Sequence, residues 1–391
     1  MSDSKSRRSW IADHIAGLPR SGIRDFFELV MSMDDVISLG VGEPDFDTPW
    51  GIREATIHAL EKGRTSYTSN LGLLQAREAI CDYCTPHFGI QYNPKTECIV
   101  TVGVSEALDL ALRAILNPGD EVVYHEPCYV SYSPSIRMCH ATPVAVTTKQ
   151  ADNFALDPEA LAAAITPRTK AILLNFPNNP TGANLSPEQK QRIAEIAIER
   201  DVLVLTDEIY SELTYGPISP SIASLPGMKE RTILLHGFSK AFAMTGYRIG
   251  YACGPQVLIE AMMKIHQYSM LCASIMGQDA AIEACRNGRP AMEHMRFEYE
   301  QRRNVIVNRL NKMGLTCAKP EGAFYAYPSI ASTGLDSAEF AKRLLMEEKV
   351  AVVPGSAFSS DGASYIRCAY ATRIEVIEEA MDRMAAFIGR L

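Results

Sequence analysis

Seven short apolar segments, most of them separated by helix-like patterns, dominate the middle of this 391-residue chain. They are apolar throughout rather than alternating between apolar and polar residues, and β-branched residues are frequent in them. Strands of this kind, connected by helices, are typical of a mostly parallel sheet covered by helices on both faces. We therefore expect an α/β fold whose strands are residues 97–103, 121–127, 142–148, 170–177, 201–208, 232–239 and 246–254.

The pattern of the sequence changes near residue 286. A long amphipathic helical pattern is followed there by short strand-like segments and a final helix, which predicts a smaller α+β domain. We expect the segment before Pro49 to pack with it. The predicted division is a large domain over residues 49–285 and a small domain formed by residues 1–48 and 286–391.

The composition argues against several classes of function. A formal net charge of -8 disfavours a nucleic-acid-binding surface and a polybasic membrane patch. No run of eighteen apolar residues occurs, and the N-terminal residues lack the apolar core of a signal peptide. Ten scattered cysteines are typical of free thiols in a reducing compartment, so we expect a cytoplasmic protein without a membrane span.

Two of these cysteines, Cys81 and Cys84, form a lone CxxC pattern within a helical segment. A metal site would need a second pair of ligands, and none has suitable spacing in the sequence. We interpret the two residues as packing cysteines of a helix, and we expect no metal.

Polar residues collect where several of the expected strands end. Ligands of a parallel sheet bind beyond the carboxyl ends of its strands, so this clustering indicates a site. Each residue alone has a plainer reading. Ser105 could cap a helix, Asp207 could belong to a structural ion pair, and Asn178 or Asn179 could cap the NFPNNPTG turn. Lys240 alone could be an ordinary surface lysine.

Taken together, these residues match the needs of one ligand, pyridoxal 5′-phosphate. Its aldehyde needs a lysine, and a desolvated lysine such as Lys240 has a lowered pKa and a nucleophilic neutral amine. Its phosphate needs a cation such as Arg248 and N–H donors, which a helix beginning around Ser105 would present. Its ring nitrogen needs a carboxylate such as Asp207. The turn at Gly103 lacks the GxGxxG and GK[ST] motifs of other phosphate sites.

The order of these motifs resembles the class I and II aminotransferases, which are pyridoxal-phosphate enzymes of fold type I and include aspartate and aromatic aminotransferases. The resemblance covers nearly the whole chain. Its motifs are SLGVGEPDFDTP, YTSNLGLLQAREAI, NFPNNPTG, TDEIY, FSKAFAMTGYRIGY, PEGAFYAYP, VVPGSAF and YIRCAYA.

The resemblance implies a role for each residue around the cofactor ring. Lys240 forms the Schiff base with the aldehyde and then carries a proton between the substrate Cα and C4′ of the cofactor. Asp207 pairs with the ring nitrogen and keeps the ring cationic. Asn179 and Tyr210 donate hydrogen bonds to the phenolate oxygen, and Tyr129 stacks on the ring.

The phosphate is expected to bind the backbone N–H groups of Val104 and Ser105, the hydroxyl groups of Ser105 and Ser239, and the Arg248 guanidinium. Tyr67 is expected to reach the phosphate of the partner subunit, which makes the active unit a homodimer.

The resemblance also assigns the substrate contacts. Arg367 would grip the α-carboxylate bidentately, a task suited to a guanidinium, with help from Asn179 and the Gly42 backbone. Arg24 is a candidate ligand for the substrate side chain, and a charge on a helix surface is the alternative.

Two departures from the family pattern stand out. Gly237 occupies the first position of the Ser-x-Ser pattern found in many relatives, so Ser239 alone remains of that pair. Ser105 stands where some relatives that act on aspartate carry a lysine, so a strict preference for dicarboxylic substrates lacks one known support.

The expected function is a ping-pong transfer of the amino group from an L-amino acid to a 2-oxo acid, with 2-oxoglutarate as the expected acceptor. A C–S lyase or another reaction on the same cofactor is the alternative. A pyridoxal-phosphate-sensing regulatory protein is disfavoured, because the first forty residues are too short and not basic enough for a DNA-binding domain. The preferred amino donor stays open.

Overall fold

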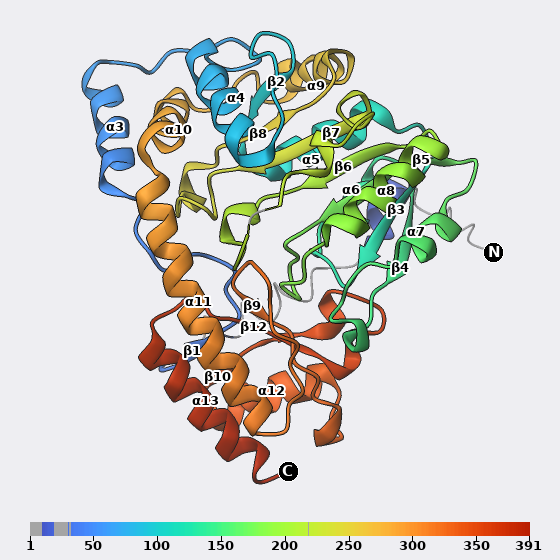
Figure 1. Cartoon of the computed structure of the whole chain (residues 1–391). Coiled ribbons are helices and arrows are strands. Elements are labelled where there is room, and N and C mark those ends of the chain that lie inside the picture. The colour runs from blue at the N-terminus through green and yellow to red at the C-terminus, as the bar shows by residue number, and fades with distance from the viewer. Residues whose placement is uncertain (1–9, 19–29, 31–32, 218) are drawn as a thin grey trace, which may run out of the picture.

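The computed structural model describes residues 10–18, 30, 33–217 and 219–391 (Figure 1). Its centre is a seven-stranded sheet, as the sequence predicts. The strands are β2 (Cys98–Thr101), β3 (Glu121–Glu126), β4 (Thr142–Thr147), β5 (Thr169–Asn175), β6 (Leu203–Asp207), β7 (Thr232–Gly237) and β8 (Gly250–Cys253).

The strand order is β2-β8-β7-β6-β5-β3-β4. β4, β3, β5, β6 and β7 pair in parallel, whereas β8 runs antiparallel to both β7 and β2. The sequence pattern placed the start of β8 too early, because Thr245–Tyr247 form a short 3₁₀ helix before the strand begins at Gly250. The reversal of β8 brings its first residue beside the last residues of β7 and β2, with Gly250 opposite Gly237 and Thr101.

Helices cover both faces of the sheet. Side chains alternate between the two faces along each strand, so a strand that is apolar throughout presents apolar side chains on both faces. In β5, Ala171 and Leu173 pack in a core with helices on one face, while Ile172 and Leu174 pack in a core on the other. The helices of this part are α3 (Trp50–Glu61), α4 (Leu74–Phe88), α5 (Gly103–Ile115), α6 (Tyr132–Met138), α7 (Pro158–Ala164), α8 (Pro187–Glu199), α9 (Gln256–Ser269) and α10 (Ile275–Asn287).

A second, smaller part lies below the sheet in Figure 1 and is built mainly from the C-terminal residues. The long helix α11 leads into it, and three short antiparallel strands form its sheet. Its elements are α11 (Arg289–Lys312), β9 (Tyr325–Ala326), α12 (Ser337–Glu348), β10 (Val350–Ala351), β11 (Val353–Pro354), β12 (Ile366–Ala369) and α13 (Ile374–Ile388).

The segment before Pro49 reaches this smaller part through β1 (Ile37–Ser38), which pairs in parallel with β10. Farther toward the N-terminus, the described residues include the short helix α1 (Asp13–Ala16). The domain boundaries at residues 49 and 285 stay a prediction. Among the described residues, no helix combines the length and the apolar character that crossing a membrane requires.

Candidate active site

A cavity of about 770 Å³ opens at the carboxyl edge of the sheet. Within the described residues, all the predicted cofactor and substrate residues except Tyr67 line it. They come from strand ends, from the start of α5 and from β12, and they are Gly42, Val104, Ser105, Tyr129, Asn179, Asp207, Tyr210, Ser239, Lys240, Arg248 and Arg367.

Asp207 is the last residue of β6, and its side chain is buried at the floor of the cavity. Burial raises the pKa of its carboxyl group to about 6, although two hydrogen bonds favour the charged form. Tyr132 donates one to Oδ2 at 2.8 Å, and the Ile209 N–H donates the other to Oδ1 at 3.2 Å. Sequence reasoning missed Tyr132, although it lies three residues after Tyr129 in the same motif.

Lys240 follows β7 by three residues, and its Nζ lies within the cavity. The ammonium group donates a hydrogen bond to the Gly42 carbonyl oxygen at 2.6 Å. Burial lowers the pKa of Lys240 to about 8; Glu43 opposes this shift, and the cations Arg367 and Arg248 add to it. A neutral amine is therefore accessible near neutral pH, which an unperturbed lysine would not provide.

The start of α5 and the Arg248 guanidinium lie close together. A Cβ atom on Gly103 would lie 2.7 Å from Arg248 Nη2, and one on Gly250 would lie 2.7 Å from the Val104 nitrogen. Arg248 has a left-handed backbone, with φ of 51°, and donates from Nη1 to the Thr245 carbonyl oxygen at 3.1 Å. The helix N-terminus and the guanidinium together form a cradle for an anion.

Two expectations about this cradle change. The N-cap of α5 is Val102, so Ser105 lies in the first turn and is not the cap that the simpler reading proposed. The space around Gly237 is tight, because a Cβ there would lie 3.0 Å from both Gly250 Cα and Val104 Cγ2. A serine at this position would require these neighbours to move by a few tenths of an ångström.

The two asparagines of the NFPNNPTG turn divide its tasks. Asn178 Oδ1 accepts hydrogen bonds from the N–H and the hydroxyl of Thr181, so it stabilises the turn. Asn179 instead reaches the cavity, where its Oδ1 accepts a hydrogen bond from Arg367 Nη1 at 3.0 Å.

Arg367, in β12, is a buried cation with only 4% of its surface exposed. Its Nη2 donates to the Gly40 carbonyl oxygen at 2.5 Å, and its guanidinium stacks over the Tyr325 ring at 4.6 Å. Its Nε has no hydrogen-bond partner, and no carboxylate lies within 4.0 Å of it in the described ranges. A buried guanidinium in this state is suited to bind a ligand carboxylate.

Tyr210 and Tyr325 form a buried pair of hydroxyl groups, 2.8 Å apart, beside Arg367. Tyr325 comes from the PEGAFYAYP motif, for which the sequence suggested no role. A Cβ atom on Gly42 would lie 2.5 Å from the hydroxyl oxygen of Tyr325. The glycine therefore leaves room for this hydroxyl group at the cavity.

One candidate residue of the described part of the chain, Tyr67, does not line the cavity. Tyr67 is 82% exposed on the surface of the chain. Arg24 lies outside the described residues, and its proposed contact with the substrate stays a prediction.

Comparison with known proteins identifies the family. A model of "Aminotransferase class I and II" matches residues 34–384. The chain belongs to the class I and II aminotransferases. YugH of Bacillus subtilis is 53% identical to this aminotransferase over 382 residues, which are 98% of this chain and 99% of that protein. The aromatic-amino-acid aminotransferase 2 of Thermococcus litoralis is 45% identical over 377 residues, covering 96% of this chain and 97% of that protein.

The fold agrees with this assignment. The aspartate aminotransferase of Thermus thermophilus, solved with maleate, superposes with a TM-score of 0.93 at 36% identity, over 97% of this chain and 100% of that chain. The enzyme is therefore a transaminase of fold type I, and its cofactor is pyridoxal 5′-phosphate.

The cavity fits this cofactor by its donor set. The cradle formed by α5 and Arg248 suits a phosphate. Lys240 suits the aldehyde of the cofactor, and Asp207 suits its ring nitrogen. Gly103 lets Arg248 lie close to the start of α5, and Gly250 leaves room beside the Val104 nitrogen. The first N–H groups of α5, which have no partner within the helix, can therefore face an anion.

Proposed function

We propose that this enzyme transfers the amino group of an L-amino acid to a 2-oxo acid by a ping-pong mechanism, with 2-oxoglutarate as the acceptor. The observation that carries the proposal is the buried Arg367 guanidinium with its unpartnered Nε, because amino acids and 2-oxo acids share the carboxylate that it would bind. The two substrates therefore occupy one site in turn.

Pyridoxal 5′-phosphate, bound covalently through Lys240 Nζ, supplies the electron sink for the bond that breaks at the substrate Cα. Lys240 would hold the cofactor through Nζ, and its neutral amine would move a proton at the substrate Cα. Its lowered pKa suits this work, since an acid–base group is most effective when its pKa lies near the working pH. Asp207 would hold a negative charge against the ring nitrogen, and Tyr210 and Asn179 would provide donors for the phenolate oxygen.

Arg367 orients the substrate. Its stacking on Tyr325 and its hydrogen bonds to Asn179 and Gly40 fix the plane of the guanidinium before the substrate arrives. A carboxylate bound in that plane leaves the substrate Cα free to face Lys240. Because the guanidinium is already held in place, it orients the substrate without a rearrangement of the site.

The reaction is tested by a panel of amino donors with 2-oxoglutarate, with glutamate formation as the readout. Aspartate and aromatic amino acids are the first donors to try, because the relatives are named for both. Formation of glutamate that requires both substrates, with parallel double-reciprocal plots, supports the proposal. Release of pyruvate and ammonia from a cysteine conjugate without any 2-oxo acid would instead identify a C–S lyase.

We expect Arg367→Lys to raise KM for the amino donor and for the 2-oxo acid alike, by about ten- to a hundredfold. A lysine keeps the charge but loses the bidentate geometry, and a hydrogen bond to a charged group contributes about 1.5–3 kcal/mol. Steady-state kinetics with both substrates varied provide the measurement. Arg343→Lys, on the surface of α12, is the matched control. A KM change for only one substrate would show that Arg367 does not bind the shared carboxylate.

We further propose that the enzyme is a homodimer in which Tyr67 contacts the cofactor phosphate held by the partner subunit. Tyr67 is exposed, and so are the apolar side chains of Tyr268, Met270 and Leu271 at the end of α9. Asn70 joins the two segments by donating to the Leu271 carbonyl oxygen at 2.8 Å. Exposed apolar side chains on joined segments are suited to a protein interface. A cytoplasmic location stays a prediction.

We expect Tyr67→Phe to remain dimeric and to bind pyridoxal 5′-phosphate about tenfold more weakly, since one hydrogen bond to a charged phosphate is lost. Sedimentation gives the oligomeric state, and a fluorescence titration of the cofactor-free enzyme gives the affinity. Tyr268→Phe removes a hydroxyl from another exposed tyrosine, at the end of α9, and should leave the affinity unchanged. Equal affinities of the two variants would contradict the role of Tyr67, and a monomeric wild-type enzyme would contradict the dimer.

A further inference from the structure

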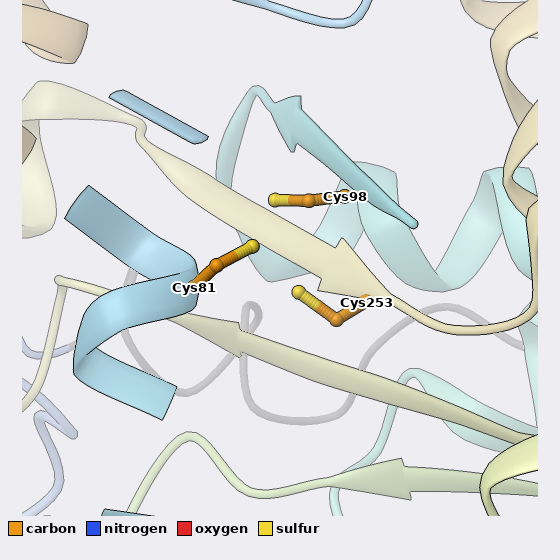
Figure 2. Close-up of side chains that lie close together, drawn as sticks. All are labelled: Cys81, Cys98 and Cys253. Carbon is orange, nitrogen blue, oxygen red and sulfur yellow. The ribbon is translucent and has the colours of Figure 1, made fainter. Parts of the chain in front are cut away.

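Three cysteines from three different elements meet inside the large part of the molecule (Figure 2). Cys81 belongs to α4, Cys98 begins β2, and Cys253 ends β8. Their sulfur atoms all lie within 4.8 Å of one another. Cys98 and Cys253 face each other across the antiparallel pair, and Cys81 approaches them from the helix at the left of Figure 2.

This cluster is separate from the active site. It lies at the first residue of β2 and the last residue of β8, whereas the cavity lies at the opposite ends of the same strands, beside Thr101 and Gly250. The three side chains are at most 4% exposed, so the cluster is closed to solvent.

A buried cation lies beside the cluster without a carboxylate partner. Arg77 is 6% exposed and precedes Cys81 by one turn of α4, so the two side chains share a face of the helix. Its guanidinium donates to the carbonyl oxygens of Gly72, at 3.3 Å, and Pro94. Within the part of the chain that the structure describes, Arg77 has no ion pair. A buried charge of this kind requires a compensating negative charge nearby.

We propose that Cys81, Cys98 and Cys253 bind one zinc ion in a closed thiolate site, with Arg77 as the balancing charge. Three thiolates and one Zn²⁺ carry a net charge of minus one, which a single guanidinium neutralises. Three thiolates around a monovalent ion such as Cu⁺ would leave one negative charge uncompensated, so the charges favour a divalent thiophilic cation. Each thiol loses its proton to solvent when the metal binds.

The geometry suits an ion of this size. When three atoms lie within 4.8 Å of one another, a point exists that is at most about 2.8 Å from each, and zinc–sulfur bonds of about 2.3 Å require shifts of only about half an ångström. Cys84, three residues after Cys81 on α4, is also buried, and its sulfur lies 3.8 Å from the Tyr251 hydroxyl oxygen. A rotation of this side chain would let Cys84 complete the four-coordinate shell as a neutral thiol, which leaves the charge balance with Arg77 unchanged.

Cys81 and Cys84 pack within a helix, as expected from the lone CxxC pattern. The fold adds two cysteines from strands that are distant in sequence, which the spacing of the pattern does not show. All ten cysteines are free in the structure. A disulfide between Cys98 and Cys253 would use only two of the three sulfurs and would supply no charge to balance Arg77.

The test uses the full-length holoenzyme, expressed with Zn²⁺ in the medium and passed through a desalting column. Elemental mass spectrometry should find about one zinc per chain. Cys98→Ala and Cys253→Ala should each lose at least nine-tenths of this zinc, whereas Cys317→Ala, which removes a buried cysteine outside the cluster, should retain it. Expression with Co²⁺ in place of Zn²⁺ should add a thiolate-to-cobalt charge-transfer band in the near ultraviolet, visible as a difference from the zinc form.

If the cluster variants fail to fold, the wild-type chain still decides the question through its metal content and its cobalt spectrum. Wild-type enzyme that carries no zinc and shows no cobalt–thiolate band would overturn the proposal. Equal zinc in a folded Cys98→Ala variant, or a Cys98–Cys253 disulfide in the purified protein, would overturn it as well. None of these readouts depends on transaminase activity, so they are independent of the proposed substrates.

Discussion

Replacement of Lys240 by alanine should abolish turnover, with a loss of at least about a thousandfold, and should remove the absorbance band of the lysine-bound cofactor. The side chain both attaches the cofactor and moves the proton, and acid–base catalysis alone contributes about 10²–10⁴-fold. Its Nζ is held in the cavity by the Gly42 carbonyl oxygen, in the position where both tasks are needed. Absorbance spectra and initial rates of glutamate formation measure the two losses.

Two further variants separate the chemical role from the charge. Lys240→Arg keeps a cation next to Glu43 but offers no neutral amine, so it should lose activity to the same extent as Lys240→Ala. Lys264→Ala removes an exposed lysine from the surface of α9 and should retain full activity. Substantial turnover in Lys240→Arg would show that the charge, rather than the nucleophile, is what the site requires.

The lowered pKa of Lys240 has a consequence for cofactor capture. Only the neutral amine attacks an aldehyde, and burial places its pKa at about 8. In the cofactor-free enzyme, the rate of capture should therefore rise with pH up to about 8 and level off above it. Stopped-flow absorbance after mixing with pyridoxal 5′-phosphate measures this rate. A profile that still rises steeply above pH 10 would indicate an unperturbed lysine.

The sheet could be predicted from sequence because its strands are buried on both faces and are therefore apolar throughout. The reversed direction of β8 could not, because an apolar run has the same pattern in either direction. This reversal matters for the site. Arg248 comes just before β8 and Lys240 just after β7, and the antiparallel pairing brings these two strand ends to the same edge of the sheet. The family resemblance identified both residues, but only the pairing of Gly237 with Gly250 shows how they become neighbours.

The site residues that sequence reasoning missed act through other side chains. Tyr132 contacts Asp207, Tyr325 contacts Tyr210 and Arg367, and Gly40 accepts a hydrogen bond through its backbone. Contacts of this kind depend on tertiary packing, which no local pattern encodes. The cysteine cluster was missed for the same reason, because its members are separated by up to 172 positions in the sequence.

Asp207→Asn should lower kcat by about a hundred- to a thousandfold while pyridoxal 5′-phosphate remains bound, since removal of one fixed electrostatic group typically costs this much. The asparagine retains the shape of the side chain and can still accept the hydrogen bond from Tyr132, so the main change is the lost charge opposite the ring nitrogen. Single-turnover rates and the cofactor absorbance give the measurement. Asp201→Asn removes an exposed charge after α8 and is the control. An unchanged rate in Asp207→Asn would show that the ring nitrogen does not depend on this carboxylate.

The pH profile tests the same carboxylate through its neighbour. Burial raises the pKa of Asp207 to about 6 in the cofactor-free chain, whereas the hydrogen bond from Tyr132 and, in the holoenzyme, the cationic ring nitrogen both favour the charged form. Tyr132→Phe removes that donor, so the pKa should rise further and activity should be lost at a higher pH than in the wild-type enzyme. The acid limb of kcat/KM should therefore move upward in Tyr132→Phe, and it should vanish in Asp207→Asn, which has no carboxyl group to protonate. An acid limb that is the same in all three enzymes would assign it to another group and leave Tyr132 with a role in packing alone.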